Sequence, residues 1–134
     1  LDALDVLNGR GEVLIDELGL TPWRDVRAAD LSYGRKRVLE IATTLALDPE
    51  VLLLDEPMAG MNVEEKEDMS RFILDVNDEF GTTIALIEHD MGVVMDLSDR
   101  AVVMDYGRKI GDGTPSEVRN NQAVIDAYLG VAHD

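Results

Sequence analysis

The stretch VLLLDEP, residues 51–57, decides the fold. It is a short apolar run closed by two carboxylates and a proline, the pattern of a strand buried on both faces of a parallel sheet. A second run, TTIALIEHD at residues 82–90, opens with β-branched residues and also ends in polar groups. Because an amphipathic helical pattern separates the two runs, strands and helices alternate, and the sequence predicts an α/β fold with a mostly parallel sheet flanked by helices.

The segments around these runs predict the remaining elements. Two helical stripes indicate helices over about 34–47 and 63–79, the first stopped by Asp48-Pro49. The stripes comprise Val38, Ile41, Ala42 and Leu45, and then Met69, Phe72, Ile73 and Val76. We also expect one or two short helices up to Gly19, a short helix over 92–97, a hairpin of strands 101–105 and 108–113 turning at Tyr106-Gly107, and one last helix from a capping box at Thr114 to about Leu129.

Composition excludes several classes of function. The 134 residues are 46% apolar, enough for one folded domain, and the absence of cysteine excludes disulfides and thiolate metal sites. A net charge of −16 argues against nucleic-acid binding, since phosphate contacts need clustered cations. Because the sequence has neither a long apolar run nor an export leader, we expect a cytoplasmic protein.

Chemically useful side chains follow both apolar runs. Asp55 and Glu56 come after the first, and His89 after the second. Each alone is equally well explained as a solvated strand end or a hydrogen-bonded loop residue, but the carboxyl edge of a parallel sheet is where ligands bind. An apolar run ending in Asp-Glu is the Walker B pattern of nucleotide hydrolases, in which the Asp holds Mg²⁺ and the next carboxylate activates water.

A concentration of positive charge stands at the start of the first striped helix, in ADLSYGRKRVLEIA at residues 29–42. Ser32 and Gly34 lie where unpaired N–H groups and the helix dipole attract anions. Two interpretations stay open for the cations that follow: they add to an anion site, or they form a solvated first turn.

Four motifs in order give a family resemblance that covers essentially all of the chain. LSYGRKR (31–37), VLLLDEP, MAGMN (58–62) and IEHD resemble the signature, Walker B, D-loop and switch histidine of the nucleotide-binding subunit of ATP-binding cassette (ABC) transporters. The resemblance implies the C-terminal part of a P-loop NTPase domain. Residues 1–47 would be part of the helical signature subdomain, and residues 48–134 the C-terminal part of the RecA-like ATPase core.

The resemblance also implies a role for each site residue. Glu56 and His89 would be catalytic, Asp55 would hold Mg²⁺, and Gly60 and Asn62 would belong to the D-loop at a dimer interface. The signature would bind the ATP of the opposite subunit through Ser32, Tyr33, Gly34 and Arg35. Arg35 replaces the usual Gln and Asn62 the usual Asp, which leaves those two roles open.

Within the family, Tyr33, AGMN and the segment from IEHD onward look most like the ATPases of branched-chain amino acid importers. The implied function is ATP hydrolysis that drives amino acid uptake, with a second ATPase subunit, membrane permease subunits and, indirectly, a solute-binding protein as partners. The implied location is peripheral, on the inner face of the cell membrane. The alternatives are the C-terminal lobe of a DNA-repair or chromosome-maintenance cassette ATPase and a non-enzymatic interaction module.

No lysine of the sequence stands in a Gly-Lys-Ser/Thr motif, so a Walker A is missing and we expect the chain alone to be inactive. In the resembled fold the Walker A strand lies between strands 83–87 and 101–105. The expected outcomes are direct pairing of these strands, local disorder, or pairing across copies of the chain, which we favour because an apolar edge promotes association.

Overall fold

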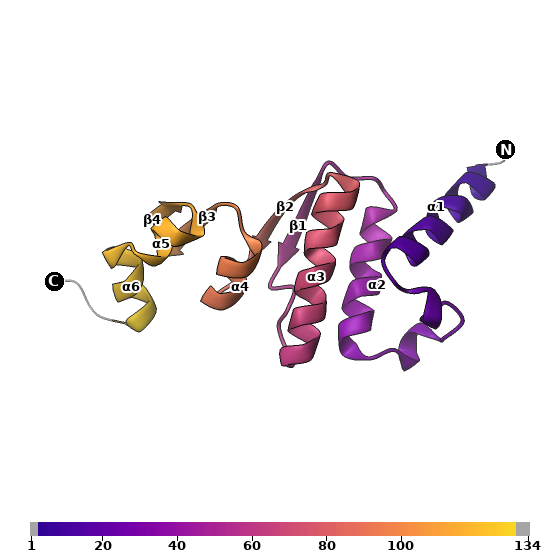
Figure 1. The fold of residues 1–134 in the computed structure, drawn as a ribbon, viewed down its shortest axis with the longest axis horizontal. Coiled ribbons are helices and arrows are strands. Elements are labelled where there is room, and N and C mark those ends of the chain that lie inside the picture. The colour runs from indigo at the N-terminus through magenta and orange to yellow at the C-terminus, as the bar shows by residue number, and fades with distance from the viewer. Residues whose placement is uncertain (1–2, 131–134) are drawn as a thin grey trace. The chain divides into compact units, whose positions relative to one another are not determined.

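The computed structural model describes residues 3–130, with side chains described from residue 9 onward (Figure 1). The chain divides into two compact units, Leu1–Ile87 and Glu88–Asp134, and each is described by itself. The first unit contains α1 (Ala3–Glu17), η1 (Thr21–Trp23), η2 (Ala28–Asp30), α2 (Tyr33–Leu45), β1 (Val51–Asp55), α3 (Val63–Phe80) and β2 (Thr83–Ile87). The second contains α4 (Met91–Leu97), β3 (Ala101–Asp105), β4 (Arg108–Gly113), α5 (Pro115–Arg119) and α6 (Gln122–Leu129).

The first unit is built on the predicted parallel strand pair. β1 and β2 run in register from Val51 opposite Thr83 to Asp55 opposite Ile87, with α3 as the crossover between them. α3 buries the four predicted positions of its stripe, and α2, which packs beside α3, buries Ile41, Ala42 and Leu45 (Figure 1). The α/β class and the principal helices are therefore confirmed.

The expectation that the first strand is buried on both faces is wrong for this chain. Leu52 is 4% exposed, whereas Val51 is 54% and Leu53 75% exposed. Side chains alternate between the two faces of a strand, so Leu52 points to the covered face and its neighbours to the other. Ile87 on β2, 64% exposed, shows that the described part of the chain leaves apolar surface on this small sheet.

The first segment forms one helix, which is one of the two predicted outcomes: α1 continues through Gly9 and Gly11 without a break, although a glycine inside a helix costs about 1 kcal/mol relative to alanine. Two later helices differ from the sequence prediction. α2 ends at Leu45, because two turn residues and Asp48, at φ 54°, lead out of the helix. The prediction of a single last helix is also wrong. α5 ends at Arg119, and Asn121 begins a second helix, α6, by accepting a hydrogen bond from the Ala123 N–H at 2.9 Å.

The second unit contains the predicted antiparallel hairpin of β3 and β4. Its two-residue turn has φ 45° at Tyr106 and 77° at Gly107, the pair of positive angles that a type I′ turn requires. Arg100 donates two hydrogen bonds to the Asp112 carboxylate, at 2.8 and 2.9 Å, and Lys109 donates another at 3.2 Å. These bonds lower the pKa of Asp112 to about 2.

The described strands form two separate pairs, β1 with β2 and β3 with β4. β2 and β3 belong to different units, so the three outcomes expected for residues 83–87 and 101–105, pairing across copies among them, stay predictions. Among residues 3–130, none of the helices combines the length and apolar character that a membrane crossing needs.

Candidate functional site

The start of α2 has the geometry of an anion site. Ser32 caps the helix in extended conformation and its Oγ accepts from the Arg35 N–H at 3.4 Å. Gly34 is the second residue of the helix, as the sequence predicted. The N–H groups of a first helical turn have no intrahelical acceptor, so this end carries open donors and the positive end of the helix dipole.

The glycine at position 34 is not demanded by the chain's own packing. A Cβ atom placed there would lie 3.4 Å from Cγ and Oε1 of Glu65, an ordinary van der Waals contact, and its φ is not in the left-handed region. Alanine also has the higher helix propensity. The packing of the described chain therefore does not explain why glycine occupies position 34. Close approach of a ligand to the backbone would explain it.

The predicted D-loop lies against this helix start. Gly60 has φ +77°, which favours glycine, and a Cβ there would lie 3.7 Å from Cε1 of Tyr33. Asn62 caps α3: its Oδ1 accepts from the Glu65 N–H at 2.9 Å, while the Glu65 carboxylate accepts from the Asn62 N–H at 3.1 Å. Asn and Asp cap helices about equally well, so the replacement of the family's Asp keeps the cap. The predicted signature and the predicted D-loop therefore lie next to each other.

Glu56 is held in an uncommon backbone conformation. It follows β1 with φ 45°, its N–H donates to the Ile87 carbonyl at 2.9 Å, and its own carbonyl accepts from the Ala59 N–H at 3.1 Å. A non-glycine residue in this region costs of order 1–3 kcal/mol, and such residues cluster at functional sites. Nothing in the sequence pattern signalled this strain.

Asp55 ends β1 with an exposed side chain, and no ion pair or hydrogen bond engages its carboxylate among residues 9–130, whose side chains the structure describes. The described chain has no cluster of three or more ligating side chains that could hold a metal ion. Mg²⁺ commonly binds through one or two carboxylates together with waters and phosphate oxygens, so Asp55 with Glu56 beside it fits that ion. It does not fit a metal that needs a full protein cage.

His89 belongs to the second unit, where its side chain is exposed just before α4. The neighbouring Asp90 caps that helix by accepting from the N–H groups of Gly92 and Val93, at 3.0 and 3.4 Å. The other predicted site residues all lie in the first unit.

The partner of Arg35 was not predicted from the sequence. The Cζ atom of Arg35 lies 4.0 Å from the centroid of the Trp23 ring, which is cation–π geometry. Trp23 is the only tryptophan of the sequence. The two residues are 12 positions apart and lie in different elements, so helical spacing in the sequence does not predict their contact.

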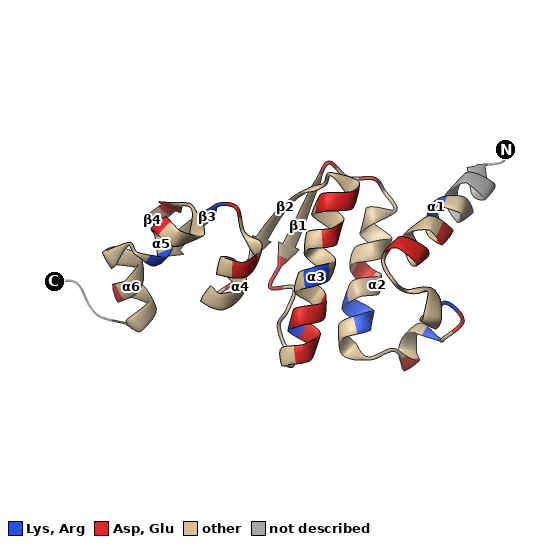
Figure 2. Ribbon diagram, in the orientation of Figure 1, with Lys and Arg blue, Asp and Glu red and all other residues tan. Residues whose placement is uncertain are grey.

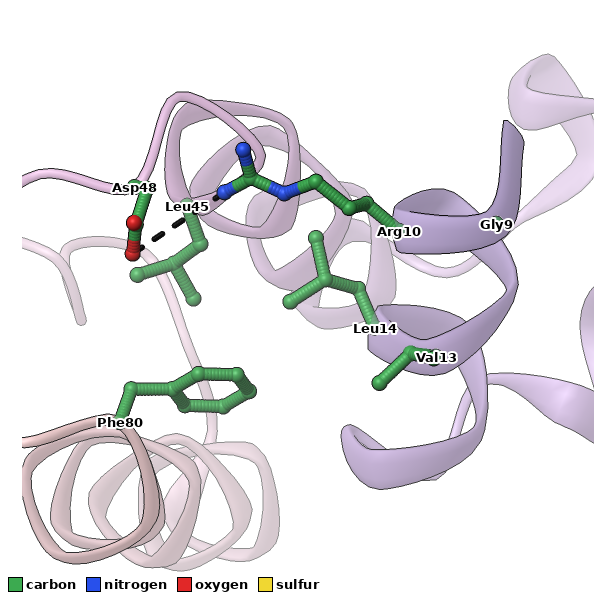
Figure 3. A pocket seen from close by; sticks show the side chains of 7 residues that line it. All are labelled: Gly9, Arg10, Val13, Leu14, Leu45, Asp48 and Phe80. Carbon is green, nitrogen blue, oxygen red and sulfur yellow. Dashed lines mark ion pairs between the residues drawn. The ribbon is translucent and has the colours of Figure 1, made fainter. Parts of the chain in front are cut away.

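A pocket of about 320 Å³ lies elsewhere in the first unit, between α1 and the ends of α2 and α3 (Figure 3). Leu14, Leu45 and Phe80 turn toward it, and Arg10 and Asp48 form an ion pair at its edge, 4.0 Å apart. None of the predicted site residues lines this pocket.

Comparison with known proteins assigns the chain to a family. Residues 7–59 match the family model described as "ABC transporter", and residues 108–134 match "Branched-chain amino acid ATP-binding cassette transporter". Over 131 residues, 98% of the chain, it is 44% identical to the high-affinity branched-chain amino acid transport ATP-binding protein LivG of Salmonella typhimurium. The chain is part of an ABC transporter ATP-binding domain.

Two further relatives support this ABC assignment. The high-affinity branched-chain amino acid transport ATP-binding protein BraF of Pseudomonas aeruginosa is 44% identical to the chain over 118 residues, which are 88% of the chain. The solved structure of cbiO1 from Clostridium perfringens, described as part of the ABC transporter complex cbiONQ, superposes with a TM-score of 0.83 over 98% of the chain at 28% identity. The chain spans 50% of LivG, 46% of BraF and 52% of the cbiO1 chain.

The two family matches fall on different parts of this ABC domain. The general match ends at Ala59, inside the loop between β1 and α3. The branched-chain match begins at Arg108 and covers β4, α5 and α6. The C-terminal unit therefore carries the narrower likeness to branched-chain amino acid ATP-binding cassette transporters, and residues 7–59 carry the general one.

Proposed function

We propose that this chain supplies the signature, Walker B and switch residues of a composite ATP site in a branched-chain amino acid importer. The observation that supports it most is Gly34 at the open start of α2, where the chain's own fold would accept a side chain. A phosphate group approaching the helix N-terminus explains both the missing side chain and the open N–H donors. In this proposal the nucleotide is held by a second ATPase subunit.

The proposed chemistry is hydrolysis of the γ-phosphate of ATP. Asp55 would hold Mg²⁺, which supplies neutralisation of the phosphate charge when bound. Glu56 orients and deprotonates the attacking water, and His89 donates to the γ-phosphate. We assign residues 1–47 to the helical signature subdomain and 48–134 to the ATPase core.

The proposed partners follow from the relatives' names. LivG and BraF are named for branched-chain amino acid transport, and cbiO1 is described as part of a transporter complex. The complete protein therefore pairs with a second ATPase subunit and docks on membrane permease subunits at the inner face of the membrane, with a solute-binding protein acting at a distance.

Asp55→Asn in the complete protein tests the metal assignment. The amide keeps the size of the side chain but loses the charge that Mg²⁺ prefers, so we expect Mg²⁺-dependent ATP binding to weaken by about tenfold or more, while Mg²⁺-free binding is unchanged. Titration of both proteins with fluorescent ATP, with and without Mg²⁺, measures this. Asp68→Asn, an exposed residue on α3, is the matched control. Equal Mg²⁺ dependence in wild type and Asp55→Asn would refute the role.

A further inference from the structure

The segment between α1 and α2 is held by few contacts. Residues 21–30 form the two short turns η1 and η2, and their backbone hydrogen bonds are local, such as Arg24 N–H to the Thr21 carbonyl at 3.3 Å and Val26 N–H to the Trp23 carbonyl at 3.0 Å. Trp23 is the one residue of this segment that is not exposed. Arg24 also pairs with Glu12 of α1, at 2.6 Å.

Trp23 is tied to α2 through Arg35, whose guanidinium carbon lies 4.0 Å from the ring centroid. The backbone N–H of Arg35 donates to Ser32 Oγ and so caps α2. The distance between these two atoms is 3.4 Å, near the limit for a hydrogen bond. Arg35 therefore joins segment 21–30 to the first turn of α2 with its side chain and closes the helix cap with its backbone. Figure 2 shows the basic residues gathered at this end of α2.

We propose that Arg35 is a positioning residue and not a nucleotide ligand: its guanidinium, stacked on Trp23, fixes the chain that enters α2 and so orients Ser32 and the open N–H groups. The guanidinium plane suits a ring face, whereas an ammonium group gives only a point charge. The stack itself is independent of the proposed function. Its consequence for ATP rests on that function.

Amide hydrogen exchange of this chain tests the stack directly. Exposed cation–π pairs contribute about 0.5–1 kcal/mol, so Arg35→Gln should speed exchange of the Arg24 and Val26 amides about two- to fivefold. Trp23→Leu should do the same, and the double variant should add nothing further. Arg35→Lys should fall between wild type and Arg35→Gln, and the amides of α3 should not change in any variant.

Arg27→Gln is the matched control, because it removes one positive charge, as Arg35→Gln does, but leaves the stack of Arg35 on Trp23 intact. It should leave the Arg24 and Val26 amides at wild-type rates. Acrylamide quenching of the single tryptophan gives a second signature: quenching should increase in Arg35→Gln and not in Arg27→Gln. Unchanged exchange and unchanged quenching in Arg35→Gln would overturn the stack, and leave the proposed ATPase function standing.

The ATPase activity of the complete protein separates positioning from binding. A positioning role predicts that Arg35→Gln and Trp23→Leu lower kcat by the same factor with little change in KM for ATP, and that the double variant equals either single one. A ligand role predicts that Arg35→Gln raises KM while Trp23→Leu has no effect, which would overturn the proposal. If the complete protein hydrolyses no ATP, the proposed function fails, and the exchange result still decides the stack.

Discussion

Glu56→Gln in the complete protein is expected to reduce ATP hydrolysis by roughly a hundred- to ten-thousandfold, the range attributed to a positioned general base. The amide keeps the size of the side chain but cannot accept the proton of the attacking water. ATP binding should stay within about twofold of wild type, because it rests on other groups. Steady-state phosphate release and nucleotide titration measure the two effects.

The strained backbone at position 56 provides a second variant. Glu56→Gly also removes the carboxylate, but glycine adopts φ 45° freely, so this variant should unfold at a higher temperature than Glu56→Gln while being equally inactive. Glu64→Gln, which removes an exposed carboxylate in the first turn of α3, is the control and should keep full activity. Wild-type hydrolysis by Glu56→Gln would end the assignment of Glu56 as the base.

Gly34→Ala is expected to separate folding from function. The added Cβ meets only ordinary contacts with Glu65, so stability should be unchanged or should rise by up to about 1 kcal/mol. ATP hydrolysis by the complete protein should fall roughly a hundredfold, because a methyl group at the helix end displaces the phosphate from its donors. Thermal unfolding and phosphate release on the same preparation measure both.

Gly11→Ala is the matched control for this prediction. Gly11 lies inside α1, where a Cβ would meet nothing within 4 Å, so this variant receives the same helical stabilisation with no loss of activity. If Gly34→Ala hydrolyses ATP as fast as Gly11→Ala, no ligand approaches the start of α2 closely and the proposed site is wrong.

Local patterns explain what the sequence predicted correctly. β1 and α3 are marked by a continuous apolar run and by a stripe at helical spacing, and the hairpin is marked by a Tyr-Gly turn between two short strands. These signals depend on residues a few positions apart, and so does the capping box that starts α5. The start of α2 was predictable for the same reason, from Ser32 before a stripe.

The features that sequence reasoning missed depend on residues far apart or on backbone angles. Arg35 meets Trp23 across 12 positions, and Glu65 lies against Gly34 across 31. The left-handed conformation of Glu56 is set by its hydrogen bond to Ile87 on the neighbouring strand. The break at Asn121 was missed because its Nδ2 donates to the Ile110 carbonyl on β4, at 3.3 Å, which favours a cap over a continuing helix.

The central claim is that the start of α2 faces a nucleotide bound by another subunit. The sequence contains no cysteine, so Ser32→Cys introduces one defined thiol into this region. In the complete protein carrying Glu56→Gln to slow turnover, this thiol is paired with a single cysteine in the phosphate-binding loop of the partner subunit, and disulfide formation is followed with and without ATP. We expect a covalent dimer that forms in the presence of ATP and is absent without nucleotide. No crosslink under any nucleotide condition, or the same crosslink without ATP, would contradict the claim.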